Sequence, residues 1–388
     1  MPPQSQLIAS FSVSVSNRNL AENQARISYK SAPPLPVRPN AWSMAWKKLT
    51  DWERWPFAVF YFPLSFVWIW HILRARAFWF FSPSNPTLTF GGFEGEGKKE
   101  MYEQLPADAF PATVFIQPDE DFDAVLKKIE DTGLRWPFIV KPDIGMKSLF
   151  FRKIDNPEQL REYHQHCPVE YLAQDLIDLP MEVGVFYVRH PLEPKGRITG
   201  MVQKDPPRVV GDGRSTLREL IAVHPRARFR FEEMCRKHAH ALESVIPHGE
   251  LYYLSYAGSR NRGAQIVNLN HLIDDRLAEV FDRFSHYNGQ FFYGRYDVKC
   301  RTVDDLREGR HFSIIEFNGC GSGVTHIFHS GLTVFQAYAE ILRHWRMLAA
   351  ISLHNNRVRK IPYWSFWRGV QHLRKASRHF KWLEQHDY

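Results

Sequence analysis

The fold of this chain is decided by residues Phe291–Gly319, which read FFYGRYDVKCRTVDDLREGRHFSIIEFNG. Two apolar runs rich in strand-forming residues, 290–298 and 311–317, flank a polar connection. Both runs carry acidic or amide groups where a half-buried strand normally carries hydrophobic side chains. We predict that they pair as an antiparallel hairpin that turns near Leu306–Gly309.

The polar side chains of these runs are predicted to gather on one face of the hairpin. Arg295 and Asp297 are two residues apart, so on a strand they project from the same face. Glu316 and Asn318 have the same spacing, and the pairing places Asp297 opposite Glu316. Carboxylate and amide oxygens are the ligands that a hard divalent ion takes, and an arginine beside a cation suits a transferring phosphoryl group. The alternative is an exposed hairpin whose salt bridges contribute little stability.

The composition is that of a globular protein with basic ends. The 388 residues are 44% hydrophobic and 24% charged, which excludes an intrinsically disordered chain. The formal net charge of +8 would suit nucleic acid, an anionic membrane or anionic nucleotides, but most of the excess lies near the two ends. The four cysteines form no CxxC pair, so they predict neither a disulfide framework nor a zinc site, and they fit a reducing compartment. The 18 histidines show no HExxH spacing.

The N-terminal part is predicted to contain a tail, an aromatic segment and a linker. Residues 1–40, rich in Ser, Pro, Asn and Arg, predict a disordered tail. In the aromatic segment 41–82, the uncharged run Trp55–Trp70 is shorter than the roughly 20 residues that a spanning helix needs. It is either an interfacial segment at the lipid headgroups or a hydrophobic helix pair packed against the main domain or a second subunit. Residues 83–109, with several glycines and prolines, predict a linker and a short helix.

Two strand ends upstream of the hairpin carry a lysine that suits phosphate. A strongly apolar strand, Phe138–Val140, ends at Lys141, and a flexible lysine there can reach nucleotide phosphates as a point charge. A later strand ends at Lys204. It leads into VVGDGRSTLRELI, where tight turns precede a helix that we expect Ser215 to cap.

Between these two strands lies a segment that suits the rest of a nucleotide. The strand Tyr171–Ala173 runs into a short link, Gln174–Leu179, and a second strand follows from Glu182. Such a link can offer backbone N–H and C=O groups to an adenine edge. Glu182 would then accept hydrogen bonds from ribose hydroxyls.

The order of these elements closely resembles the ATP-grasp superfamily. The branch that contains D-alanine–D-alanine ligase and the ATP-grasp part of cyanophycin synthetase is the most similar, and VVGDGRSTLRELI resembles the latter. The resemblance covers residues 110–345 and leaves residues 346–388 as a C-terminal extension. It implies an α+β fold in which two α/β subdomains enclose ATP, between aromatic N-terminal helices and a basic aromatic C-terminal helix.

The resemblance also implies a role for each candidate residue. Lys141 and Lys204 would hold the ATP phosphates, and Arg295 would stabilise the transferring phosphoryl group, with Lys141 and Arg295 as the catalytic pair. Adenine would meet the backbone of Gln174, Asp175, Leu176 and Ile177, and the ribose would meet Glu182. Mg²⁺, with Mn²⁺ as an alternative, would be bound by Asp297, Glu316 and Asn318. Superfamily members phosphorylate a carboxylate to an acyl phosphate, which an amine or a thiol then attacks, so a ligase that acts on small molecules is implied.

Two features depart from the family pattern. The lid after Lys141 normally carries several glycines, but DIGMKSLFF retains only Gly145, so lid closure is in question. Gln174 and Asp175 replace the usual acid-then-base pair of the adenine hinge. A nucleotide-binding but catalytically silent scaffold, at a membrane or in an assembly, therefore stays open as the alternative function.

The C-terminal tail is basic and aromatic. Eight Lys or Arg occur from Arg357 to Lys381 with no acid among them, which is typical of an interfacial or polybasic segment, while a solvated basic helix is the alternative. We expect an anionic membrane surface as a partner, through residues 42–81 and 357–382. We expect no specific nucleic acid, because no RNA- or DNA-binding module is recognisable. These features predict a cytoplasmic protein, peripheral on the inner membrane face, and leave a homodimer open.

Overall fold

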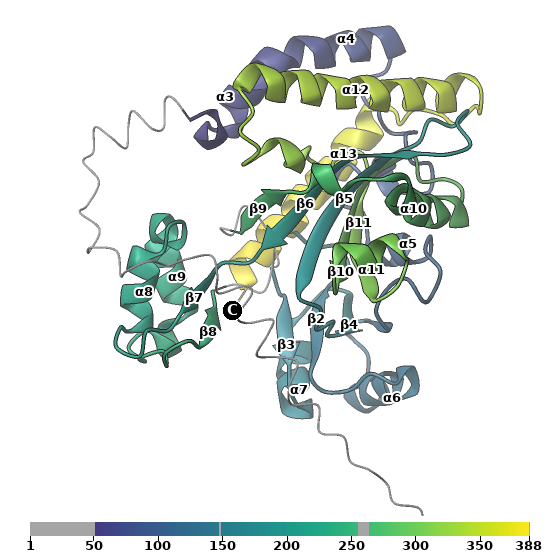
Figure 1. Ribbon diagram of the computed structural model, residues 1–388. Coiled ribbons are helices and arrows are strands. Elements are labelled where there is room, and N and C mark those ends of the chain that lie inside the picture. Colours follow the sequence, from purple (N-terminus) through teal and green to yellow (C-terminus); the bar gives the residue numbers. More distant parts are fainter. Residues whose placement is uncertain (1–50, 147–148, 255–263, 388) are drawn as a thin grey trace, which may run out of the picture. The chain divides into compact units, whose positions relative to one another are not determined.

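The computed structural model describes residues 51–146, 149–254 and 264–387 (Figure 1). By internal contacts the chain divides into two units, 1–47 and 48–388, and the described residues all belong to the second. The predicted tail 1–40 lies outside the described residues, and so does Lys147 of the glycine-poor lid.

The first sheet has four antiparallel strands. Their order is β1-β4-β2-β3, with bounds Thr113–Ile116, Tyr171–Asp175, Phe138–Pro142 and Arg152–Ile154. Two helices accompany it, α6 (Phe122–Thr132) and α7 (Pro157–His166). The Asp121 carboxylate caps α6 by accepting from two backbone N–H groups, and Gly133, with φ of 76°, ends the helix in the left-handed conformation. The apolar sides of both helices pack with β2 and β4 in one core cluster.

The second sheet has five antiparallel strands and carries most of the predicted site. Their order is β11-β10-β5-β6-β9, with bounds Phe312–Asn318, Tyr293–Cys300, Met181–Val188, Arg197–Asp205 and Gln265–Asn268. One face packs on helix α10 (Asp275–Tyr287) through side chains of β5, β6, β10 and β11, and those of β5 and β10 alternate along the strand, as the period of two requires. The fold class is α+β, as the sequence predicts.

The hairpin of β10 and β11 has the predicted register. Asp297 lies opposite Glu316 and Arg295 opposite Asn318, and a bulge follows Asp297. The connection is longer than a turn, because Thr302 caps a short helix, α11 (Val303–Arg307), before Gly309 reverses the chain with φ of 66°. The local pattern therefore predicted the strands and their pairing but missed this helix.

A small satellite follows β6. It consists of a two-stranded sheet of β7 (Arg208–Val210) and β8 (Leu251–Tyr253), and of the helices α8 (Leu217–Val223) and α9 (Phe231–Lys237). These elements share an apolar cluster of their own. Thr216, not Ser215, caps α8, since its hydroxyl and Glu219 form a capping box. Ser215 instead donates to Asp212 in the preceding turn.

Residues 41–50 of the predicted aromatic segment lie outside the described residues, and its described part forms helices that pack on the long helix α12 (Val334–Arg357). The stretch Phe57–Ala75 comprises α3 (Phe57–Tyr61), η2 (Phe62–Leu64) and α4 (Ser65–Ala75). Within the described residues it is the one helical stretch apolar and long enough to cross a membrane, with 19 residues and a mean hydropathy of 1.4. Phe60 and Leu64 are buried on one side of this stretch, where they pack with α12. That side is therefore packed against the main domain, as the packed-helix alternative expects.

The C-terminal helix α13 (Phe366–His386) packs against apolar clusters beside both of the larger sheets. Ala376, Phe380 and Leu383 belong to the core cluster of the first sheet, while Val370 and Leu373 pack against an aromatic cluster beside the second. The backbones of Trp79 and Trp364 pair in an isolated antiparallel β-bridge, which holds the start of this helix against the aromatic segment. The remaining short helices are α5 (Lys98–Tyr102), η1 (Trp52–Arg54), η3 (Thr89–Gly91), η4 (Ala227–Arg230), η5 (Ala239–Ala241), η7 (Asn270–Leu272) and η8 (Thr325–Ile327).

Candidate active site

The candidate site occupies the face of the second sheet that does not pack on α10. Alternation sends Tyr296 and Val298 into the α10 core, which leaves Arg295 and Asp297 on the opposite face. Gly184 of β5 lies opposite Asp297, and a Cβ there would lie 3.3 Å from the Asp297 Oδ1 atom. The missing side chain leaves room for the charged groups of the neighbouring strands.

Asp297 is the centre of a buried ion-pair network. The Nε and Nη2 atoms of Arg295 donate to its two oxygens at 2.8 and 3.1 Å, and Lys204 Nζ lies 2.8 Å from Oδ2. The same lysine lies 3.3 Å from Glu182 Oε1. Burial alone would raise the pKa of Asp297, but Arg295 and Lys204 outweigh it and lower that pKa to about 2. The structure thus brings four predicted residues together, with Arg295 held by Asp297.

Glu316 and Asn318 are placed differently from Asp297. Both side chains are half-buried on β11, and among the described residues neither makes a hydrogen bond or an ion pair. An unpaired carboxylate and an unpaired amide beside the Asp297 network provide oxygen donors with free lone pairs. This donor set fits a hard divalent cation, and Glu316 can bind one without giving up a protein partner.

Lys141 reaches the same place from the first sheet. Its Nζ donates to the carbonyl oxygen of Ile315 at 3.4 Å, so the end of β2 meets β11. Burial and the nearby Lys98 lower the pKa of Lys141 to about 7, against the opposing effect of Glu316 and Glu182. A bound phosphate would favour the charged form of this lysine.

Two charged residues of the predicted linker also belong here, and the sequence reasoning missed them. The buried Lys98 donates from Nζ to the carbonyl oxygen of Asp143 at 3.0 Å. Burial, with Glu316 and Glu100 as like charges, raises the pKa of Glu96 to about 7. Gly97 lets its segment approach the segment that contains Asp143, since a Cβ at Gly97 would lie 2.5 Å from Asp143 Oδ2. The available signal was the alternation of glycine with charge in EGEGK.

The four residues predicted to contact adenine do not all lie in one link: Gln174 and Asp175 end strand β4, whereas Leu176 and Ile177 follow it. Gln174 is buried in this inner strand, where its Nε2 donates to the Tyr102 hydroxyl at 2.8 Å and the Thr113 hydroxyl at 2.7 Å. The backbone N–H of Asp175 donates to the Ala112 carbonyl oxygen. Leu176 and Ile177 follow the strand, and Leu176 is 37% exposed.

The described residues of the lid, on either side of 147–148, are held by neighbouring elements. His379 of α13 lies 2.7 Å from the Ile144 carbonyl oxygen. Asp387 accepts from the backbone N–H of Phe150 at 2.9 Å and from Arg152 Nη2 at 3.0 Å. The Phe150 ring is fully buried in the core of the first sheet. The described part of the lid is therefore anchored by packing and by the C-terminal helix.

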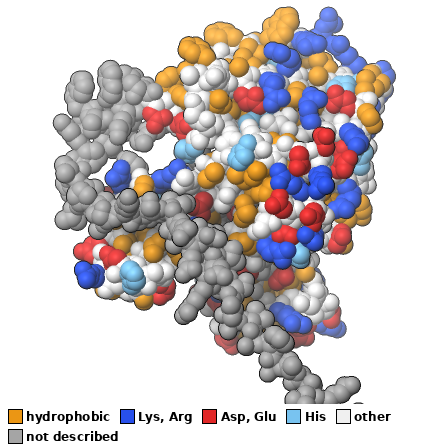
Figure 2. All heavy atoms as spheres, in the orientation of Figure 1, with side chains coloured by type: hydrophobic (Ala, Val, Ile, Leu, Met, Phe, Trp, Pro, Cys, Tyr) orange, Lys and Arg blue, Asp and Glu red, His pale blue; other side chains and the backbone are white. Residues whose placement is uncertain are grey.

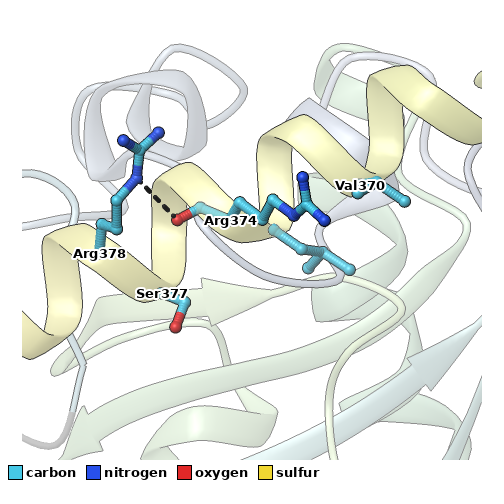
Figure 3. Close-up of a pocket in the computed structure, with 5 residues that line it drawn as sticks. Val370, Arg374, Ser377 and Arg378 are labelled. Atoms are coloured by element: carbon cyan, nitrogen blue, oxygen red, sulfur yellow. Dashed lines mark hydrogen bonds between the residues drawn. The ribbon is translucent and has the colours of Figure 1, made fainter.

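A separate hollow runs along α13. It has a volume of about 660 Å³ and is lined by Val370, Leu373, Arg374, Ser377 and Arg378. Figure 3 shows both arginines projecting from the helix, with Arg378 Nε donating to the Arg374 carbonyl oxygen at 3.4 Å. None of the residues predicted for nucleotide or metal lines it.

Comparison with known proteins gives structural matches without sequence matches. No protein-family model matches this chain, and no curated protein sequence does. A bifunctional glutathione synthetase from Pasteurella multocida is 15% identical over 61% of this chain and 34% of its own, with a TM-score of 0.33. The chain thus spans about a third of that enzyme. A D-alanine–D-alanine ligase from Bacillus anthracis is 14% identical over 68% of each chain, with a TM-score of 0.37.

Proposed function

We propose that this protein is an ATP- and Mg²⁺-dependent ligase of the ATP-grasp type that joins a carboxylate to an amine or a thiol. The observation that carries the proposal is the unpaired Glu316 carboxylate between cationic groups from two sheets, Lys141 on one side and the Lys204–Arg295 network on the other. Such a ring of cations around oxygen donors suits a polyphosphate with its metal ion.

Each residue would then have a defined task. Lys141 and Lys204 would hold phosphate oxygens, and Arg295 would shift part of its contact from Asp297 to the transferring phosphoryl group. Asp297, Glu316 and Asn318 would hold Mg²⁺, or Mn²⁺, which supplies charge neutralisation at the phosphates when bound. The link after β4, at Leu176 and Ile177, would offer free backbone to the adenine, and Glu182 would take the ribose. The carboxylate substrate would become an acyl phosphate, which the amine or thiol attacks.

The second candidate is a scaffold that binds ATP without turnover. It is favoured by the lid, which retains one glycine and is tied to α13 through His379 and Asp387. A lid that cannot open or close would prevent substrate entry or exclusion of water.

Turnover separates the two candidates. For the ligase we expect Mg²⁺-dependent phosphate and ADP release that rises when pools of amino acids, small carboxylic acids and thiols are added to the full chain. For the scaffold we expect Mg²⁺-dependent ATP binding by calorimetry with no substrate-stimulated release. Absence of both binding and release would contradict the whole assignment.

We further propose that the protein works in the cytoplasm, bound to the inner membrane face. The outer side of the stretch Phe57–Ala75 carries an exposed apolar stripe at helical spacing: Phe62, Phe66, Ile69, Trp70 and Leu73. Figure 2 shows hydrophobic side chains gathered along the edge where α4 lies in Figure 1. All four cysteines are free thiols, as a reducing compartment requires.

Removing two anchors of this stripe tests the membrane proposal. Phe66 and Trp70 are 66% and 60% exposed, so Phe66→Ser with Trp70→Ser should barely change stability but lower binding to anionic vesicles at least about tenfold. Leu192→Ser, at a 73% exposed residue outside the stripe, is the matched control. Vesicle sedimentation measures the effect. Equal sedimentation of all three proteins would contradict the proposal, as would a dimer in solution that only the double variant dissociates.

A further inference from the structure

A second cluster of polar groups lies on the same sheet face, outside the proposed nucleotide site. It joins His326 of η8 to Glu340 and His344, which are four residues apart on α12 and therefore share a face of the helix. The Glu340 Oε1 atom lies 2.9 Å from His326 Nε2 and 3.2 Å from His344 Nε2. All three ligand atoms lie within 4.8 Å of one another.

This spacing is close to that of a tetrahedral metal site. Zinc holds imidazole nitrogens and carboxylate oxygens at about 2.0–2.2 Å, which puts neighbouring ligand atoms about 3.3 Å apart. Two imidazoles and one carboxylate are a common three-ligand set for catalytic zinc, which leaves a fourth position for water or substrate. The two nitrogen–oxygen distances, 2.9 and 3.2 Å, thus need only a small expansion.

The histidines are buried, and the Nε2 atom of each faces the Glu340 carboxylate. His326 is 4% exposed and His344 is fully buried, while Glu340 keeps 21% of its side chain exposed as a route to solvent. Within the described residues the Nε2 atom of His344 makes no hydrogen bond, although it faces the Glu340 carboxylate. The 3.2 Å contact with Glu340 leaves the hydrogen-bonding capacity of this buried nitrogen incompletely used, and a metal ion between the two groups would use it.

The surrounding residues hold the ligands in place. Gly200 of β6 makes room for His326, because any Cβ there would collide with its imidazole ring. Asn268 donates to the His326 carbonyl oxygen at 2.9 Å, which fixes the loop. Arg343 donates to both Glu340 oxygens, at 2.5 and 2.9 Å, and so orients the carboxylate. This support is what the outer contacts of a metal site provide.

We propose that His326, Glu340 and His344 bind a zinc-type divalent cation, separate from the Mg²⁺ that the nucleotide would bring. The competing explanation is a metal-free ion-pair network in which Glu340 neutralises Arg343 and accepts from the histidines. The alternatives differ in a measurable way, since only the first gives a site with defined stoichiometry and tetrahedral geometry. The proposal does not depend on the ligase assignment.

The position of this site relates it to the proposed reaction. Phe186 lies opposite Gly200 on one side and opposite Arg295 on the other, so one row across the sheet runs from the His326 ring to the phosphoryl-binding arginine. The Phe186 ring meets the His344 ring edge-on, with centroids 4.6 Å apart. A cation here would stand one aromatic ring away from Arg295.

Metal binding by the full-length protein is the test. After chelation and dialysis, the chain is titrated with Zn²⁺ against a chromophoric chelator, and Co²⁺ is added separately to record its visible spectrum. We expect one Zn²⁺ per chain and the intense bands of tetrahedral cobalt. Glu340→Gln, a partly exposed isosteric change, should weaken Zn²⁺ binding at least about tenfold, and His326→Gln about 100-fold.

A matched variant guards against zinc bound by other histidines. His354→Gln lies on the same helix, pairs only with the His190 ring among the ring contacts of the described residues, and should bind Zn²⁺ as the unchanged chain does. Circular dichroism confirms that each variant is folded, and if one ligand variant is not, the other decides. Equal Zn²⁺ affinity in the unchanged chain and a folded ligand variant would overturn the proposal. An octahedral cobalt spectrum or less than half an ion per chain would overturn it as well.

Discussion

Replacing Glu316 by glutamine is expected to weaken Mg²⁺-dependent ATP binding about 100-fold or more while leaving the protein folded. The side chain makes no hydrogen bond or ion pair within the described residues, so its neutralisation leaves no charged partner stranded. A metal ligand that loses its charge should cost more than the ~1.5–3 kcal/mol typical of one charged hydrogen bond, where each 1.4 kcal/mol is tenfold. Isothermal titration with ATP, in Mg²⁺ and in chelator, measures the change.

Glu308→Gln supplies the control for this experiment. Glu308 lies on the same hairpin, is 46% exposed and pairs with Arg310 at the surface, so the same chemical change there should leave ATP binding unaltered. If Glu316→Gln binds ATP as tightly as Glu308→Gln does, Glu316 is no metal ligand and the central claim about the site is wrong.

Asp297→Asn, unlike Glu316→Gln, is expected to destabilise the fold, with a loss of about 3 kcal/mol or more in the free energy of unfolding. The substitution keeps the shape of the side chain but leaves Arg295, which is 15% exposed, without its ion-pair partner, and leaves Lys204, which is 10% exposed, with Glu182 alone. Breaking one partner of a buried ion pair typically costs ~3–5 kcal/mol. Urea unfolding followed by tryptophan fluorescence measures the free energy of unfolding.

The pH dependence of stability gives an independent view of the same group. The folded pKa of Asp297, about 2, lies below its ordinary value of 3.8, so its contribution is present above that value and is lost as the pH falls through 4 towards 2. Asp297→Asn should flatten stability in this window. Asp304→Asn, whose carboxylate is 80% exposed, should stay within about 0.5 kcal/mol of the unchanged chain. An Asp297→Asn protein equally stable would show that the network contributes nothing.

Sequence reasoning reached furthest where the determining interactions are local. The alternation of apolar and polar residues sets which face Arg295 and Glu316 occupy, and pairing of two nearby strands then sets their register, because a slip of one residue would bury the charges. The lysines at strand ends were found for the same reason. The prediction that these lysines meet the hairpin in one site needed the order of elements along the whole chain.

The rest depends on contacts that no local pattern contains. Lys98 and Glu96 reach the site because a glycine loop packs against Asp143, 45 residues further on. The i, i+4 spacing of Glu340 and His344 is visible in the sequence, but His326 joins them only through the packing of η8 on the sheet. The ion pair of Arg295 with Asp297 corresponds to the salt-bridge alternative rather than to the preferred prediction of a phosphoryl clamp, since the sequence does not show which partner an arginine takes.

The C-terminal helix has a consequence for folding. Because Ala376, Phe380 and Leu383 complete the core around the first sheet while Val370 and Leu373 pack beside the second, neither core is whole until the last helix has docked. The two halves should therefore gain their stability together, at the end of folding, as one cooperative unit. A nascent chain emerging from the ribosome would hold both halves incomplete until translation reached α13.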